Sequence, residues 1–169
     1  HANSPVSDIT LPWLADIYVG KVNTWPNGKP LRIVLRPKAE SDNTVLKSMS
    51  GEMNRAVTAA LERKGMIIAL TDQDNADAIE NIPGTLGAAT LGQITAERRR
   101  LKLLSINGVT PSTQAMTDGS YHYYKTFTMV TGAIMSPLAQ KFIAFVDSNQ
   151  GREILLKTGH RLAAKKNGP

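Results

Sequence analysis

Residues 31–44 read LRIVLRPKAESDNT, and this stretch decides the fold class. Its first six residues are mostly apolar and have proline on both sides, which predicts a buried β-strand over 31–36. From Ser41 onward, apolar residues recur at helical spacing, which predicts a helix. The stretch is therefore a strand, a short turn and a helix in succession.

The same succession repeats along the chain. MIIAL at 66–70 predicts a second buried strand, and the polar TDQD that follows it leads into another helix. Strands that alternate with helices indicate an α/β fold, here a three-layer α/β/α sandwich around a mostly parallel sheet. Other strands are predicted over 85–91, 101–108 and 121–132, and other helices over 10–20, 53–65, 74–82, 112–119, 136–148 and 151–159, with one more expected to carry the arginine run at 98–100.

Length and composition favour a single domain and exclude several kinds of site. The chain has 169 residues, 41% of them hydrophobic, enough to bury a core without disulfides. It has no cysteine, so disulfides, thiolate metal sites and cysteine nucleophiles are excluded. No apolar run approaches the roughly 20 residues needed to cross a bilayer. The start, His1-Ala2, reads either as the remnant of a signal-peptide cleavage site or as a cloning remnant.

The net charge of +6 favours anionic partners. Much of the excess lies in the 98–102 cluster and in the tail after Arg161, and neither cluster contains an aromatic residue that could stack on bases. Both clusters are therefore read as solvated surface, and nucleic-acid binding is not expected.

The best candidate site lies in the turn between the first strand and its helix. Ligands of parallel α/β sheets bind beyond the carboxyl ends of the strands, where helix amino termini attract oxyanions. Arg36 offers a planar fork for two oxygens, while Ser41, Asn43 and Thr44 offer hydroxyl and amide groups. Asp42 can accept a proton from a partly protonated oxyanion such as hydrogen phosphate.

Simpler readings of these residues remain open. Ser41 or Asp42 can cap the helix while Arg36 pairs with Glu40 on the surface. In the second turn, Asp72 is a further candidate ligand contact, although capping of the next helix is the simpler role for this turn.

No pattern supports catalysis, a metal or a cofactor. The chain lacks a GxxxxGK[ST] phosphate loop and a GxGxxG run. His122 and His160 have no neighbouring serine and carboxylate that would suggest a triad. The tyrosines of 121–124 read as core or rim residues, with a ligand cleft as the alternative. A non-enzymatic protein is predicted.

The order of these features resembles the phosphate-type periplasmic solute-binding proteins of ABC transporters. SDITLPWLADIYVGKVNTWPNGKPLRIVLR, residues 7–36, is similar to the family's helix and the arginine-ending strand that follows it. IPGTLGAATL, the segment from LKLLSINGVTPS to the return strand, and KFIAFVDSNQGREILLKTGH resemble later family segments. The matching positions of the first stretch are Ile9, Thr10, Leu14, Ile17, Tyr18, Gly20, Lys21 and Trp25.

The resemblance implies a type II periplasmic-binding-protein fold, mainly its second lobe and carboxy-terminal return segment. It implies one domain over 1–162, with a lobe core at about 28–130, return helices at about 131–162, and a basic flexible tail at 163–169. It also implies binding of inorganic phosphate or a similar oxyanion in the periplasm, for delivery to the membrane subunits of an ABC importer. The family's anion contacts carry over to Arg36 and Ser41, and less directly to Asn43 and Thr44.

Two departures keep an alternative open. RPKAESDNT lacks the glycines of the family's usual turn, and family members begin with a further stretch that supplies the opposite wall of the cleft. A stand-alone interaction or sensor module that kept the fold but lost transport, and that pairs with itself as a homodimer, is therefore the second hypothesis.

Overall fold

The computed structural model describes residues 1–163 and contains two compact units, the first ending at Lys125 and the second starting at Thr126. Within this part of the chain, no helix is long and apolar enough to cross a membrane. The predicted boundaries at 28–130 and 131–162 stay a prediction, and nearly all of the predicted basic tail lies outside the described residues.

The first unit contains β1 (Asp8–Ile9), α1 (Leu11–Val19), β2 (Arg32–Leu35), α2 (Ser41–Ser48), α3 (Gly51–Glu62), β3 (Ile67–Ile68), α4 (Asp72–Asn81), β4 (Thr85–Leu86), α5 (Leu91–Ala96), β5 (Ser105–Ile106) and α6 (Thr113–Asp118). The second unit contains α7 (Pro137–Asp147) and α8 (Asn149–Lys157).

The central sheet of the first unit has three strands in the order β3-β2-β4. Both pairings are parallel, with Val34 opposite Ile67 and Arg32 opposite Thr85. Parallel neighbours need a crossover between them, and helices supply it here. The predicted α/β fold with a parallel sheet is confirmed.

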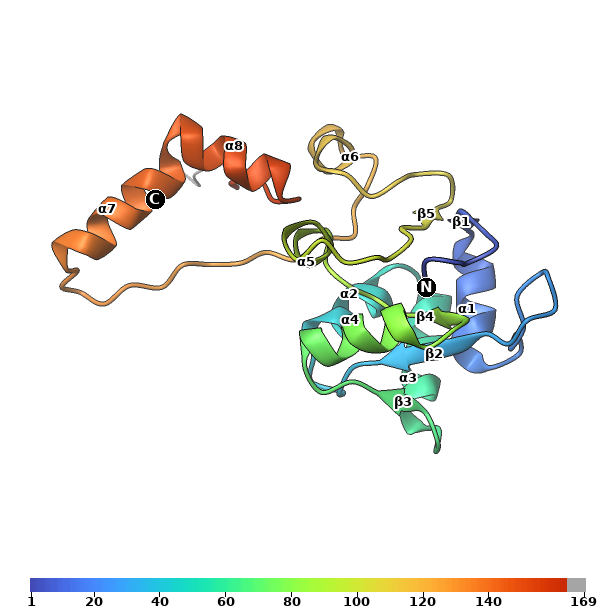
Figure 1. Cartoon of the computed structure of the whole chain (residues 1–169). Coiled ribbons are helices and arrows are strands. Elements are labelled where there is room, and N and C mark those ends of the chain that lie inside the picture. Colours follow the sequence, from blue (N-terminus) through green and yellow to red (C-terminus); the bar gives the residue numbers. More distant parts are fainter. Residues whose placement is uncertain (164–169) are drawn as a thin grey trace. The chain divides into compact units, whose positions relative to one another are not determined.

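Helices cover both faces of this sheet (Figure 1). Because side chains alternate along a strand, Ile33 and Leu35 point to one face and Val34 to the other. Ile33 and Leu35 pack with residues of α1 and α3, whereas Val34 packs with Ile79 of α4 and with Ala69. The unit is therefore a three-layer sandwich centred on β2.

Local signals set the limits of α1. Thr10 caps it by accepting a hydrogen bond from the Trp13 amide at 3.4 Å, and a proline lies in its first turn. Gly20 ends the helix in the left-handed conformation, with φ of +85°, which favours glycine. The predicted helix at 10–20 is confirmed.

A second, two-stranded sheet joins β1 to β5. The strands are parallel, with Asp8 opposite Ser105. An Asn-Gly turn, Asn107-Gly108, follows β5, and both of its residues have positive φ. The Asn107 side-chain oxygen accepts from the Leu11 amide at 3.1 Å, so this turn also holds the first turn of α1.

Two predicted strands differ in the structure. The segment at 66–70 is an edge strand and not a buried one: Ile68 and Leu70 are 52% and 69% exposed, because β3 has a neighbour on one side only. Residues 121–132 form no strand in the described chain, although β-forming residues are frequent there. An extended segment becomes a strand only when a neighbour shares its backbone hydrogen bonds, and no described segment pairs with this one.

The arginine run also differs from the prediction. The helix α5 ends at Ala96, and Arg98 has a positive φ of 53° that interrupts any continuation. The Arg99 side chain is only 16% exposed and pairs with Asp77, Glu80 and Glu97. Arg99 is therefore a structural ion-pair residue and not part of a freely solvated cluster.

The second unit is a pair of helices joined at Ser148. The Ser148 side chain accepts from the Gly151 amide at 3.2 Å and so caps α8 directly after α7 ends. A Cβ at Gly151 would lie 2.2 Å from the Phe145 carbonyl oxygen, so this tight corner requires glycine. The helix predicted at 136–148 is confirmed, with Ser136 as its cap.

Candidate functional site

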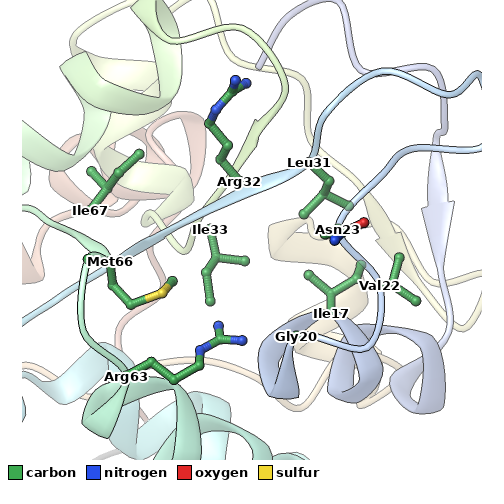
Figure 2. Close-up of a pocket in the computed structure, with 11 residues that line it drawn as sticks. Ile17, Gly20, Val22, Asn23, Leu31, Arg32, Ile33, Arg63, Met66 and Ile67 are labelled. Carbon is green, nitrogen blue, oxygen red and sulfur yellow. The ribbon is translucent and has the colours of Figure 1, made fainter.

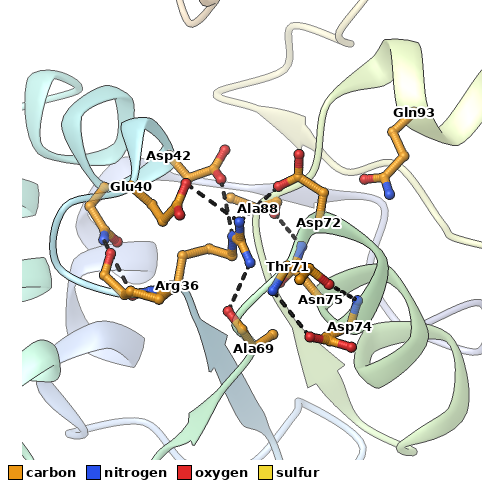
Figure 3. A network of polar contacts seen from close by, with 12 residues as sticks. Arg36, Glu40, Asp42, Ala69, Thr71, Asp72, Asp74, Asn75, Ala88 and Gln93 are labelled. Atoms are coloured by element: carbon orange, nitrogen blue, oxygen red, sulfur yellow. Dashed lines mark hydrogen bonds and ion pairs between the residues drawn. The ribbon is translucent and has the colours of Figure 1, made fainter.

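The candidate site lies at the carboxyl edge of the central sheet, where β2 and β3 lead into α2 and α4 (Figure 3). Arg36 follows the last residue of β2 directly and occupies the middle of the network. Both helices begin beside it. The free amide groups and the dipoles of their amino termini give the backbone at this edge a partial positive charge.

Arg36 is buried, with only 5% of its side chain exposed. Its Nη1 donates to the Ala69 carbonyl oxygen at 2.8 Å, and its Nη2 donates to Asp72 Oδ1 at 3.0 Å. Glu40 Oε2 lies 3.4 Å from Nη2, and Asp42 Oδ2 lies 3.6 Å from Nε. The guanidinium therefore joins the ends of two strands and lies among three carboxylates.

Asp42 lies between two cations. Its Oδ2 faces Arg36, and its Oδ1 lies 2.6 Å from the ammonium group of Lys125. Asp42 is 8% exposed and Lys125 is 17% exposed. Both carboxylate oxygens of Asp42 therefore face a positive charge, and the side chain bridges Arg36 and Lys125.

Sequence reasoning did not identify Lys125 or Glu40 as part of this site. Lys125 follows three tyrosines in YHYYK, far from α2 in the sequence. No local motif marks it, because it meets Asp42 only through the tertiary fold. Glu40 appeared only as the partner of a surface ion pair, whereas the arginine in that pair is buried.

The other predicted contacts divide into two kinds. The Asn43 amide donates to the carbonyl oxygens of Pro37 and Arg36, at 2.7 and 3.3 Å, so it holds the turn. Ser41 and Thr44 are exposed, and within residues 1–163 their hydroxyl groups have no hydrogen-bond partner. They are free to meet a ligand from solvent.

The prediction that residues of the two turns cap the following helices is wrong at α2 and correct at α4. At α2 the N-cap is Glu40, without a side-chain capping bond, so the reading of Ser41 or Asp42 as the cap is wrong. At α4 Thr71 is the cap, and it exchanges hydrogen bonds with Asp74 in a capping box. Asp72 therefore does not cap the helix, and its side chain accepts a hydrogen bond from Arg36 instead.

Two buried polar atoms at this edge have no hydrogen-bond partner: Arg36 Nε and Asn75 Oδ1. Buried polar atoms are nearly always satisfied, so such exceptions call for a ligand, a water or a mobile neighbour. Asn75 uses its amide nitrogen to donate to the Ala88 carbonyl oxygen at 2.8 Å, which fixes the side chain beside the network. One unpaired donor and one unpaired acceptor thus lie at the same sheet edge.

The charges of the site decide which ligands fit it. Three carboxylates, Glu40, Asp42 and Asp72, face two cations, Arg36 and Lys125. A ligand that only accepts hydrogen bonds meets this surplus of negative charge at a cost. A ligand with both oxygen acceptors and a proton suits the arrangement better. No cluster of three His, Asp or Glu side chains suited to a metal ion occurs within residues 1–163.

A family model described as a PBP superfamily domain matches residues 1–150 of this chain. The phosphate-binding protein PstS 2 of Streptococcus pneumoniae is 32% identical over 102 residues, which cover 60% of this chain and 32% of the relative. The resemblance seen in the sequence is therefore confirmed at the level of the superfamily and of a phosphate-binding relative.

Solved structures support the same fold. A protein assigned as a phosphate ABC transporter substrate-binding protein, from Clostridium perfringens and with bound phosphate, has a TM-score of 0.74 at 18% identity; the match covers 97% of this chain and 66% of that one. PstS from Borrelia burgdorferi has a TM-score of 0.65 at 18% identity, with 96% and 66% covered. The chain thus spans about a third of the curated relative and about two thirds of the solved proteins.

Proposed function

The chain belongs to the PBP superfamily, and from this membership we propose that it supplies the oxyanion-gripping lobe of a phosphate-type solute-binding protein for an ABC import system. The binding is non-enzymatic, in line with relatives that are named as binding proteins. The chain works outside the cytoplasm, in the periplasm, and its partners are the anion and the membrane subunits of the importer.

The observation that carries this proposal is the buried guanidinium of Arg36 at the meeting point of two helix amino termini. Burial lowers the local dielectric and strengthens the attraction between the guanidinium and an anion. Arg36 Nε, which makes no hydrogen bond and has Asp42 Oδ2 3.6 Å away, provides a donor, and the exposed hydroxyl groups of Ser41 and Thr44 provide two more. Oxyanions bind well where such donors surround a helix amino terminus.

The surplus of carboxylates selects among oxyanions. The carboxylate of Asp42, which lies between Arg36 and Lys125, accepts a hydrogen bond from a ligand hydroxyl. Hydrogen phosphate carries such a proton at neutral pH, whereas sulfate does not. We therefore expect phosphate to bind and sulfate to be rejected.

Calorimetric titration of phosphate, sulfate and molybdate into the full chain tests this proposal. Arg36→Lys keeps a positive charge but removes the planar fork, and is expected to weaken phosphate binding by about tenfold or more. Asp42→Asn is expected to narrow the preference for phosphate over sulfate, because the amide can donate to either anion.

Arg55→Gln is the matched control, because Arg55 is an exposed arginine on α3 and is absent from the network. It should leave phosphate binding unchanged even though it lowers the net charge by one, which Arg36→Lys does not. If a folded sample binds none of the three oxyanions, or if Arg36→Lys and Arg55→Gln behave alike, the proposal is wrong.

The remaining partner predictions are tested separately. The comparisons give no support to a stand-alone module that has lost transport. Self-association into a homodimer stays a prediction that sedimentation would test. That the chain does not bind nucleic acid also stays a prediction, and retention on duplex DNA that falls steeply with salt would contradict it.

A further inference from the structure

A separate pocket of about 470 Å³ lies at the opposite end of the central sheet, where β2 and β3 begin (Figure 2). Its volume is in the range of small-molecule sites. Its wall is mainly apolar, and includes Ile17, Leu31, Ile33, Met66 and Ile67. It lies within the first unit and shares no residue with the Arg36 network.

One charged group, the guanidinium of Arg63, lies inside this apolar wall, close to Gly20 (Figure 2). Its Nε is buried and has no hydrogen-bond partner. Arg63 forms no ion pair and no side-chain hydrogen bond with any residue of the described chain. An unpaired buried donor on a charged side chain is costly, so an acceptor is expected here.

The neighbouring end of α1 does not supply that acceptor. The carbonyl oxygens of Asp16 and Ile17 already accept from the backbone amides of Gly20, Lys21 and Val22. A cation near a helix carboxyl terminus gains some dipole energy, but this gain is small at a partly exposed site. The guanidinium remains without a hydrogen-bond acceptor.

No acidic residue lines the pocket, so its charge is entirely positive. Arg32 also borders it, but the Arg32 guanidinium turns away and donates to the Pro83 carbonyl oxygen at 3.0 Å. Asn23 is the one neutral polar side chain among the lining residues. A single available guanidinium within a mainly apolar wall complements a monoanion with a hydrocarbon body.

We propose that this pocket binds a small amphipathic carboxylate, such as a medium-chain fatty acid. The carboxylate pairs with the Arg63 guanidinium, and the hydrocarbon body lies along Ile33 and Met66. This site is independent of the anion site at Arg36, so either site can fail without the other.

Octanoate titrated into the full chain tests the proposal, with the Met66 methyl group as an NMR reporter inside the pocket. Octanoate is expected to shift the Met66 signal with a dissociation constant of about 1 mM or below. Octanol, which has the same body without the charge, is expected to bind about tenfold more weakly.

Arg63→Gln is expected to remove the preference for octanoate over octanol, while Lys64→Gln, the exposed neighbour, retains it. Arg63→Lys, which keeps the charge, should retain part of the preference, so the test does not depend on one variant. The proposal fails if octanoate leaves the Met66 signal unmoved at about 10 mM, far above the expected dissociation constant. It also fails if octanol binds equally well, or if Arg63→Gln binds octanoate as the unmodified chain does.

Discussion

Arg36 and Arg63 lie near opposite ends of the same three-stranded sheet, and their surroundings are opposite in character. Arg36 lies among three carboxylates and a carbonyl oxygen, whereas Arg63 lies against apolar side chains with no acceptor. The same side chain therefore links two strand ends at one end of the sheet, and is an unpaired donor at the other. The partners around an arginine, more than the arginine itself, determine what it does.

Replacing each arginine with methionine should separate these two roles most strongly. Arg36→Met leaves the buried Asp42 with Lys125 as its remaining cation and removes the partner of Asp72, and is expected to lower the free energy of unfolding by about 3 kcal/mol. Arg63→Met removes no ion pair and should change it by less than about 1 kcal/mol. Urea unfolding measures both. Equal losses in the two variants would contradict the contrast.

Gly20 tests how closely Arg63 is packed. A Cβ at Gly20 would lie 2.0 Å from Arg63 Nη1, and the residue has φ of +85°. Gly20→Ala is expected to cost about 1–2 kcal/mol of unfolding free energy from backbone strain, and to displace the guanidinium.

Gly28→Ala is the control for this prediction, because Gly28 has a similar φ of +78° and no atom within 4 Å of its added Cβ. Gly28→Ala therefore introduces the backbone strain without a steric clash. Gly20→Ala should therefore cost somewhat more than Gly28→Ala in the unmodified chain, and the excess should disappear when Arg63 is also shortened to alanine. An excess that survives in that background would show that the guanidinium is not the neighbour that matters.

A substitution at Thr71 tests whether the start of α4 contributes to the candidate site at the carboxyl edge of the sheet. Thr71→Ala removes the capping box and is expected to lower the unfolding free energy by about 1 kcal/mol. Because Asp72 and Asn75 follow in the same helix, phosphate binding should weaken as well. Thr90→Ala removes the cap of α5 and serves as the comparison, with a loss of stability but little effect on phosphate binding. Identical effects of the two variants on binding would separate the start of α4 from the site.

Tyr18 gives an effect that is visible only at alkaline pH. Burial, and secondarily the charge of Asp42, raises the pKa of Tyr18 well above its ordinary value of 10.0. The unfolded chain then loses this proton at lower pH than the folded chain, so stability is fully present below pH 10 and falls as the pH rises further.

Urea midpoints of the unmodified chain and of Tyr18→Phe, compared at pH 8 and pH 11, test this prediction. The unmodified chain should lose about 1.4 kcal/mol more per pH unit above the ordinary tyrosine pKa than the phenylalanine variant. A constant difference between the two chains over this range would mean that Tyr18 titrates normally.

Local signals predicted most of the fold. Thr10, Ser112 and Ser136, the first residues of three predicted helices, each act as the helix cap, as side chains of these types commonly do. The failures occurred where structure depends on a distant neighbour. β3 was predicted to be buried but lies at the edge, and the segment 121–132 has strand-forming residues without a partner strand.

At the candidate site, too, local features were predicted from the sequence and long-range contacts were not. Its position after β2 was predictable, because ligands of parallel sheets bind where strands end and helices begin. Arg36, Asp42 and Asp72 do come together, as two of the predicted turns lie at that edge. Lys125 was not predictable, because nothing near it in the sequence indicates that it meets Asp42.

The sequence by itself determined the alternation of strands and helices and several of the helix caps, and it predicted an anion site at one edge of the sheet, because each of these depends on residues within a few positions of one another. Only the tertiary structure decided which arginine is paired and which is not. Arg36 finds Ala69 and Asp72 from 33 and 36 residues away, and Arg63 finds apolar side chains instead. An ion pair depends on distance and burial, and these are properties of the packed chain.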